Sequence, residues 1–182
     1  MAFPKGGFGP LFVLQPHAPC AVARAVTAEV RRAGASLELR YVLEAELGGL
    51  RLSAPGEGEL WQHTCFEIFL ARPGMPSYHE LNFSPAGEWR AYAFSRYREG
   101  GPLADGRLDP RIEVREAPGR LELAASVPLD ILALQGELEL GLSAVIEAAD
   151  GALSYWALRH PPGKPDFHHR DAFAARLDAV RD

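Results

Sequence analysis

The chain has 182 residues, of which 47% are hydrophobic and 24% are charged, so it is long enough for one globular domain, residues 1–182, with a buried core. Its net charge of -5 is spread over both halves with no block of Lys or Arg, which excludes a basic surface for nucleic acid or an anionic membrane. The expected partner is a small neutral ligand or a protein, including a second copy of the chain.

The N-terminal region has only one short apolar stretch, Leu11 to Leu14, and Pro16 soon interrupts it. This stretch is far shorter than a secretory core or a membrane span. Only two cysteines are present, Cys20 and Cys65, so neither a disulfide framework nor a paired-cysteine zinc site is indicated. We therefore expect a cytoplasmic protein without a bound metal.

The sequence is divided into short segments with the pattern of β-strands. Residues 36–47 alternate apolar and polar side chains, which is the period of a half-buried strand. Residues 21–32 fit a strand or a two-turn helix, and we favour the strand. A short helix is expected at residues 128–134. The nine predicted strands are 21–32, 36–47, 66–71, 78–84, 89–95, 111–117, 120–128, 137–148 and 152–160.

The 18 glycines and 15 prolines separate these segments, as in proteins with many antiparallel strands. About nine strands without alternating helices predict an all-β fold. We expect an antiparallel β-sandwich of two sheets, immunoglobulin-like or jelly-roll-like, with one or two short helices.

Glu67 lies inside the apolar run "CFEIFLA", between Phe66 and Ile68. Because successive side chains of a strand point to opposite faces, Glu67 should point away from the core that Phe66 and Ile68 enter. Pairing this strand with the next one, 78–84, places Glu67 close to Asn82. The sequence therefore predicts a polar group on the outer face of the sheet.

The turn "SPAGEW" sets the register of the following hairpin. If Ala86 and Gly87 are its central residues, Asn82 lies opposite Ala91 and the core face receives Tyr92 and Phe94. The other face then has a flat alanine floor with polar and aromatic neighbours, a surface that suits a saccharide. Its predicted members are Trp61, Glu67, Glu80, Asn82, Ser84, Trp89, Ala91 and Ala93.

Two other interpretations of this face remain open. A polar sheet face is ordinarily a solvated surface that needs no ligand, and tryptophans are more often packing residues. Glu67 and Glu80 could also form the carboxylate pair of a glycosidase. We rank hydrolysis below binding, because the sequence implies no deep cleft.

The segment "HPPGKPDFHHRD", residues 160–171, is rich in histidine and charge. His168 and His169 are adjacent and would point to opposite sides of an extended chain, so they cannot easily share a metal ion. We expect an ordered loop in which Arg, Asp and His side chains tie the chain end to the strands.

Three blocks, "LWQHTCFEIFLARP", "YHELNFSPAGEWRAYAF" and "GALSYWALRHPPGKPDFHHRDAF", resemble the bacterial DOMON-like proteins, and the resemblance extends roughly from Leu37 onward. That group is related to the DOMON domains and to the family 9 carbohydrate-binding modules. The resemblance implies a β-sandwich whose relatives bind sugars or haem b.

The resemblance also implies particular binding residues. Trp61, Glu67 and Asn82 correspond to a Trp, a Glu and an Asn that contact sugar in the relatives, and either Trp156 or Trp89 would complete an aromatic clamp. The alternative is a haem b electron carrier with Met75 and His160 as iron ligands. The favoured interpretation is non-catalytic binding of a saccharide, with no cofactor.

Overall fold

The computed structural model describes residues 8–52 and 58–179, which form twelve β-strands and three single turns of 3-10 helix. None of these helical turns is long or apolar enough to span a bilayer. The strands are β1 (Leu11–Pro16), β2 (Ala23–Ala33), β3 (Ser36–Ala45), β4 (Cys65–Ala71), β5 (Tyr78–Phe83), β6 (Trp89–Arg96), β7 (Glu99–Pro102), β8 (Arg111–Ala117), β9 (Arg120–Pro128), β10 (Leu138–Glu147), β11 (Leu153–Ala157) and β12 (Ala175–Leu177). The helical turns are η1 (Leu47–Gly49), η2 (Leu60–Gln62) and η3 (Arg170–Ala172).

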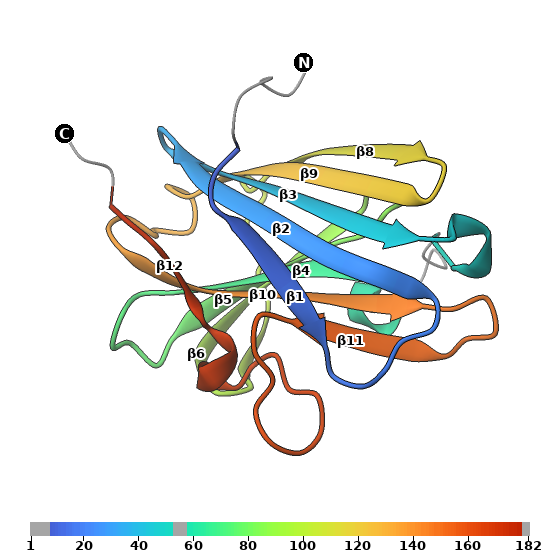
Figure 1. The fold of residues 1–182 in the computed structure, drawn as a ribbon. Helices are drawn as coiled ribbons and strands as arrows, with labels where there is room; N and C mark the ends of the chain where they lie inside the picture. Colours follow the sequence, from blue (N-terminus) through green and yellow to red (C-terminus); the bar gives the residue numbers. More distant parts are fainter. Residues whose placement is uncertain (1–7, 53–57, 180–182) are drawn as a thin grey trace.

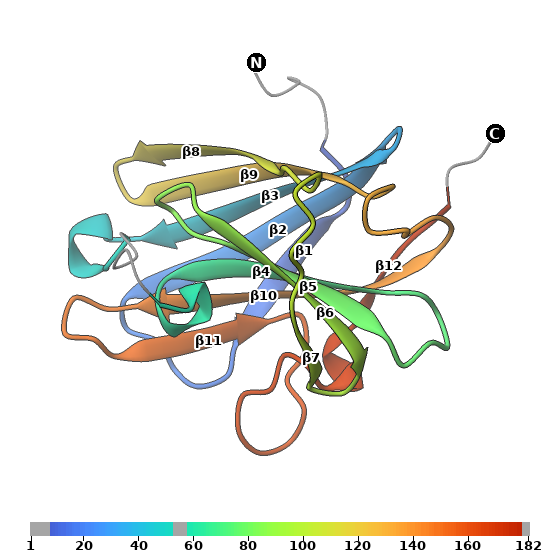
Figure 2. The same cartoon turned by 180° about the vertical axis from the view of Figure 1, so that it is seen from behind.

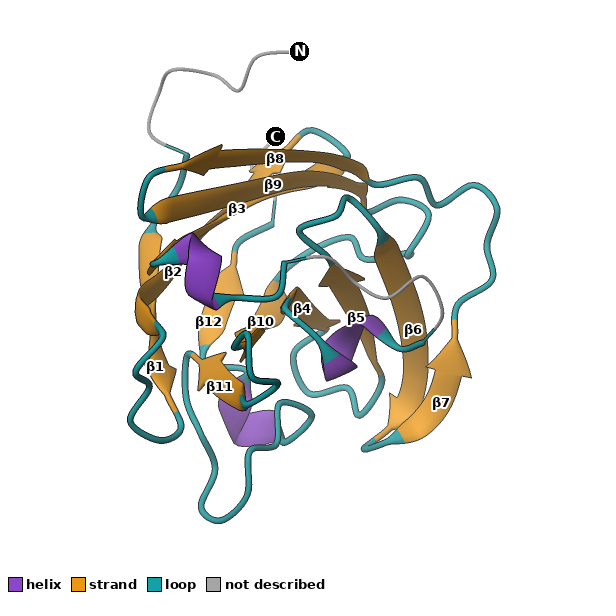
Figure 3. Cartoon of the chain, turned by 90° about the vertical axis from the view of Figure 1, so that its right-hand side faces the viewer, coloured by secondary structure: helices purple, strands orange, loops and turns teal. Residues whose placement is uncertain are grey.

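All strand pairs are antiparallel and follow one hydrogen-bonded path, β7-β6-β5-β4-β10-β11-β1-β2-β3-β9-β8, with β12 added beside β10. The path folds over at β1, which pairs with β2 through its first four residues and with β11 through its last two. Figures 1 and 2 show the resulting two layers from opposite sides, and Figure 3 shows them from the edge. One layer contains β8, β9, β3 and β2, and the other contains β11, β10, β4, β5 and β6.

The core lies between these two layers. The alternating residues of β3, among them Leu39 and Tyr41, are fully buried and meet the inward side chains of β4. Tyr41 stacks on Phe66 with 5.1 Å between ring centroids, and its hydroxyl donates a hydrogen bond to the main-chain oxygen of Glu67. This contact fixes β4 against the opposite layer.

The all-β antiparallel prediction is confirmed, and so is each of the nine predicted strands, including residues 21–32. The count of about nine strands is too low, because β1, β7 and β12 are also strands. These three are only three to six residues long, too short to show a clear alternation. The two layers are also one continuous path rather than two separate sheets.

The short helix predicted at residues 128–134 is wrong, because these residues form turns. The apolar side chains of this segment, Leu129, Leu132 and Leu134, are buried against the core cluster. These side chains belong to turns that pack against the core.

Candidate functional site

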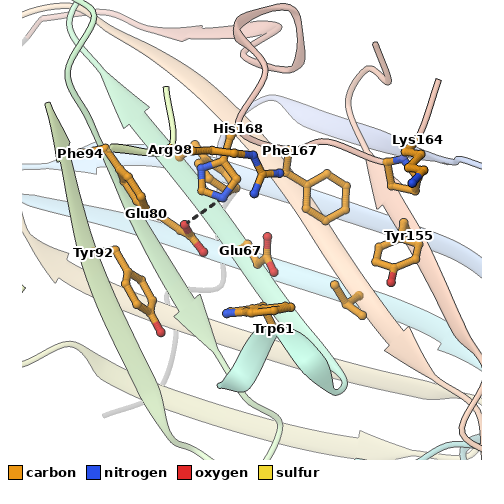
Figure 4. Close-up of a pocket in the computed structure, with 13 residues that line it drawn as sticks. Trp61, Glu67, Glu80, Tyr92, Phe94, Arg98, Tyr155, Lys164, Phe167 and His168 are labelled. Atoms are coloured by element: carbon orange, nitrogen blue, oxygen red, sulfur yellow. Dashed lines mark ion pairs between the residues drawn. The ribbon is translucent and has the colours of Figure 1, made fainter. Parts of the chain in front are cut away.

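A pocket of about 520 Å³ lies on the outer face of the layer that contains β4, and Figure 4 shows the side chains around it. Its floor comes from β4, β5, β6, β10 and β11, and its sides come from η2, the β6–β7 turn and the loop after β11. The lining residues are Trp61, Glu67, Phe69, Glu80, Tyr92, Phe94, Arg98, Val145, Tyr155, Lys164, Pro165, Phe167 and His168.

Strand pairing places Glu67 directly opposite Asn82, and Phe69 opposite Glu80, as the predicted pairing of Glu67 with Asn82 requires. Glu67 is only 2% exposed, Glu80 5% and Asn82 0%. An ordinary solvated sheet face would leave such polar side chains in water. The interpretation of this face as a wet surface is therefore wrong, since the surrounding loops cover it.

The prediction of an alanine floor is wrong, because the register of the hairpin differs by one residue from the predicted register. The amide of Gly87 donates to the carbonyl of Ser84, and Ser84 pairs with Glu88, so the loop has three residues rather than two. Gly87 has φ 87°, as the last position of a type I turn followed by a bulge requires. Leu81 consequently pairs with Ala91 on the core face.

The shifted register turns aromatic side chains toward the pocket. Tyr92 lies opposite Glu80, and Phe94 lies opposite Tyr78. The Phe94 and Tyr78 rings stack with 4.7 Å between centroids. Tyr92 donates a hydrogen bond to Glu59, just before η2. The floor beside the carboxyl groups is thus aromatic, and the expectation that Tyr92 and Phe94 enter the core is corrected.

The two buried carboxyl groups both favour the protonated form. Burial raises the pKa of Glu67 well above its ordinary value and the neighbouring Glu80 raises it further, whereas a hydrogen bond of 3.1 Å from the Ser143 hydroxyl opposes this. Burial also raises the pKa of Glu80 to about 7, against the opposing effects of the Asn82 amide at 2.9 Å and of Arg98. At neutral pH the pair therefore holds at least part of a proton.

Asn82 is hydrogen-bonded to one of the two carboxyl groups and has an unused acceptor. Its amide nitrogen donates to Glu80, and its register partner is Glu67. Its side-chain oxygen is buried and has no hydrogen-bond partner in residues 8–52 and 58–179. A buried acceptor without a partner is costly. Asn82, although predicted as a binding residue, does not line the pocket itself and lies beneath the two carboxyl groups that do.

The histidine-rich segment forms one side of the pocket. Four residues hold this segment in place, and we call them the clasp: Tyr97, Arg98, Asp166 and His168. Asp166 accepts hydrogen bonds from the Tyr97 hydroxyl at 2.6 Å, from the Arg98 guanidinium at 2.8 Å and from the His168 amide at 3.2 Å. The prediction that Asp, Arg and His tie this segment to the strands is confirmed. The segment covers the carboxyl groups through Phe167 and His168.

His168 is uncharged at neutral pH, because burial foremost and the nearby Arg98 lower its pKa to about 4. Its Nδ1 lies 2.9 Å from the Tyr78 hydroxyl, which also accepts a hydrogen bond from the Arg98 amide. Its Nε2 lies 3.6 Å from a Glu80 oxygen, the contact drawn as a dashed line in Figure 4. This contact is polar rather than an ion pair at pH 7.

Of the three tryptophans, only Trp61 lies at the pocket. It is 46% exposed on η2, and Figure 4 shows its ring next to Glu67. Trp156 is 4% exposed in the core and donates from its Nε1 to Ser154. Trp89 pairs with Phe83 and packs against the same core. Trp89 and Trp156 therefore do not line the pocket.

Contacts of the buried Glu147 side chain fix the turn that carries Trp61. The carboxylate of Glu147, at the end of β10, lies 2.7 Å from His63 Nδ1 and 3.0 Å from Arg51. The Glu147 amide donates to the Thr64 hydroxyl at 3.0 Å. Because His63 and Thr64 follow η2 directly, these contacts hold Trp61 in place beside the pocket.

Ten of the 13 pocket residues were not predicted from the sequence, and three of these ten are the apolar Phe69, Val145 and Pro165. Tyr155 could have been found, since it alternates with Trp156 and so must point to the outer face when Trp156 enters the core. Tyr92 and Phe94 follow from the three-residue turn. The other four lie in loops, where no periodicity exists: Arg98, Lys164, Phe167 and His168.

The residues of the haem alternative do not fit an axial ligand pair at this pocket. Met75 is 49% exposed in the β4–β5 loop, and neither it nor His160 lines the pocket. His160 Nε2 lies 2.8 Å from the Gln15 carbonyl oxygen, and its ring packs edge-on against His17. An iron ligand would need that nitrogen or the buried Nδ1, so we derive no chemistry through haem.

The fold is similar to solved structures of carbohydrate-binding proteins. One is from Bacteroides uniformis and is provisionally described as carbohydrate-binding; its TM-score is 0.65 at 16% identity over 93% of this chain and 85% of that one. A family 9 carbohydrate-binding module from Caldicellulosiruptor kristjanssonii, solved with glucose, gives 0.62 at 10% identity over 93% and 83%. The structure of a family 9 module from that organism with cellotriose gives 0.63 at 10% identity over 96% and 84%.

These values establish a shared fold and no more. No protein-family model matches the chain, and no curated protein has a detectably similar sequence. The DOMON-like assignment therefore stays a prediction.

Proposed function

We propose that this chain is a non-catalytic binding domain for a small saccharide, which lies in the pocket against Trp61 and above Glu67 and Glu80. The observation that carries the proposal is one half-exposed aromatic plane beside two buried carboxyl groups in a pocket of about 520 Å³. Sugars offer an apolar C–H face to such a plane and hydroxyl groups to such carboxyls. The volume lies in the range of ordinary small-ligand sites.

The fold supports the same proposal. Two of the similar structures are described as bound to glucose and to cellotriose. The predicted DOMON-like relationship, if correct, would place this chain in the same wider group. The predicted cytoplasmic location would make it a receptor for a sugar already inside the cell.

The arrangement of the carboxyl groups favours binding over hydrolysis. Glu67 and Glu80 lie on adjacent strands, and both project from the same face of the layer. A ligand in the pocket therefore has both groups on one side, whereas glycosidases need carboxyl groups that flank the scissile bond. The sequence implied no deep cleft, whereas the structure has a pocket. The choice between binding and hydrolysis therefore depends on the direction in which the two carboxyl groups project, and not on the depth of the pocket.

Calorimetric titration with mono- and disaccharides tests the proposal. Trp61→Ala should weaken binding of any sugar that the native chain binds by about tenfold or more, because the stacking plane is lost. Met75→Ala is the matched control, since Met75 is 49% exposed, close to the 46% of Trp61, but lies outside the pocket. No binding by the native chain, or equal loss in both variants, would exclude the proposal.

A further inference from the structure

The bottom of the pocket is acidic and has no basic partner of its own. Glu67 is hydrogen-bonded to Ser143, and Glu80 to Asn82. In the described ranges neither carboxyl group forms an ion pair with Lys or Arg. The one histidine near them, His168, is uncharged at neutral pH. Two buried acids without a cation are an unusual arrangement, since buried charges are ordinarily paired.

The basic groups that face the pocket are used elsewhere or lie apart. Arg98, from the β6–β7 turn, donates to Asp166 at 2.8 Å, so the carboxylate of Asp166 balances its charge. Lys164, from the loop after β11, lies beside Tyr155, across the pocket from Glu80 (Figure 4). Glu59, before η2, adds another negative charge that raises the pKa of Glu80. The net charge near the floor is therefore negative whenever Glu67 and Glu80 ionise.

The pocket is enclosed by aromatic rings. Trp61, Tyr92, Phe94, Tyr155 and Phe167 line it from four different segments, and Figure 4 shows them around the two carboxyl groups. Aromatic faces attract cations as well as sugar C–H groups, and the attraction is larger where water is excluded. Acids on the floor with rings on the sides are the combination that recognises an organic ammonium group.

The two carboxyl groups on the floor can both accept hydrogen bonds from one ammonium group. Glu67 and Glu80 each offer carboxylate oxygens, whereas the unpaired side-chain oxygen of Asn82 is buried and does not line the pocket. Asn82 lies between them, opposite Glu67 in register and hydrogen-bonded to Glu80. A primary ammonium has three N–H donors, whereas a hydroxyl group has one. A single ammonium group can therefore donate to both carboxyl groups at once, which a single hydroxyl group cannot do.

We propose that the ligand is an amino sugar whose ammonium group lies against the carboxyl groups of Glu67 and Glu80. This inference rests on the proposed function and narrows its ligand class. When the ligand binds, its ammonium group takes the place of the proton that the two carboxyl groups share. The released proton passes to solvent, so the charge of the floor balances in the complex.

Calorimetric titrations at pH 7 with glucosamine, galactosamine and mannosamine, each compared with its parent sugar and its N-acetyl form, test this inference. At least one amino sugar should bind about tenfold or more tightly than both of its comparison sugars, as a charge-assisted hydrogen bond implies. Titrations in buffers of different ionisation enthalpy should show net proton release. The Glu80→Gln and Glu67→Gln variants should each reduce the preference for the amine.

The outcomes separate this inference from the proposed function. If neutral sugars bind as tightly as the amino sugars, or if the Gln variants keep the preference, the amino-sugar inference is wrong and saccharide binding stands. If no sugar of the panel binds, both are wrong. Because Gln has the shape of a protonated Glu, the variants should fold, and their unfolding curves confirm this before titration.

Discussion

The buried carboxyl groups of Glu67 and Glu80 reduce the stability of the folded chain when they ionise. Both are enclosed by strands and loops, and each raises the other's electrostatic cost. Hydrogen bonds from Ser143 and Asn82 compensate only in part, since both pKa values remain raised. A protein keeps such groups at a cost where they have a use, and perturbed carboxyls in a pocket are typical of functional sites.

The pH dependence of unfolding should reveal this cost. The pKa of Glu80 is about 7 in the folded chain against 4.5 ordinarily, so the folded state binds more protons in between. The stability that this proton provides is complete below pH 4.5 and is lost as pH rises through 7, a change on the order of 3 kcal/mol. Urea unfolding from pH 5 to pH 8 should show a smaller loss in Glu80→Gln than in the native chain.

Glu116→Gln is the matched control for that experiment, because Glu116 is exposed on the edge strand β8, outside the pocket. It should keep the native pH dependence. An equal slope in the native chain and in Glu80→Gln would contradict the buried carboxyl pair.

At the scale of elements, the clasp joins two segments that are far apart in the chain. The β6–β7 turn and the loop after β11 meet at Asp166, and the loop then covers the carboxyl groups. Loops of this kind open more readily than strands, because few buried contacts hold them. The clasp therefore controls how well the pocket is enclosed.

Asp166→Ala should loosen this loop. The variant removes the hydrogen bonds from Tyr97, Arg98 and the His168 amide, and it should lower stability by about 1 to 2 kcal/mol. Amide hydrogen exchange should become faster in residues 163–169 and stay unchanged in β10. Ligand affinity should fall as well, since one side of the pocket is less ordered.

The matched control is Asp105→Ala, which removes an aspartate that is also paired with an arginine, Arg107 at 2.7 Å, away from the pocket. It should leave exchange in residues 163–169 as it is. Unchanged exchange in both variants would show that the clasp does not hold the loop.

Strand alternation made part of the site predictable from the sequence. The remaining site residues could not be predicted, because their positions depend on turn and loop geometry. The pattern around Glu67 was enough to assign its face and its partner Asn82, because period-2 alternation is a local property. A single residue in the "SPAG" turn changed the register, and with it the side on which Tyr92 and Phe94 lie. Arg98 and His168 reach the pocket only through tertiary contacts, for which no local pattern exists.

The site depends on the arrangement of the whole molecule. The inner face of β4 packs against the opposite layer, and its outer face is covered by loops. The opposite layer holds β4 through Tyr41 and Phe66. Trp61, the β4–β6 strands, β10 and the segment around His168 then converge on the outer face. The same fold in proteins only 10–16% identical shows that the layers tolerate very different sequences. Function must therefore be argued from the side chains on that face and not from the fold.

We propose that this outer face binds a sugar. The most direct measurement is a nuclear magnetic resonance titration of the labelled protein with the sugar that binds most tightly in calorimetry. We expect chemical-shift changes at the Trp61 indole and at the amides of Glu67, Glu80 and His168, with little change in β8 and β9. Saturable shifts confined to another surface, with the Trp61 indole unmoved, would contradict it.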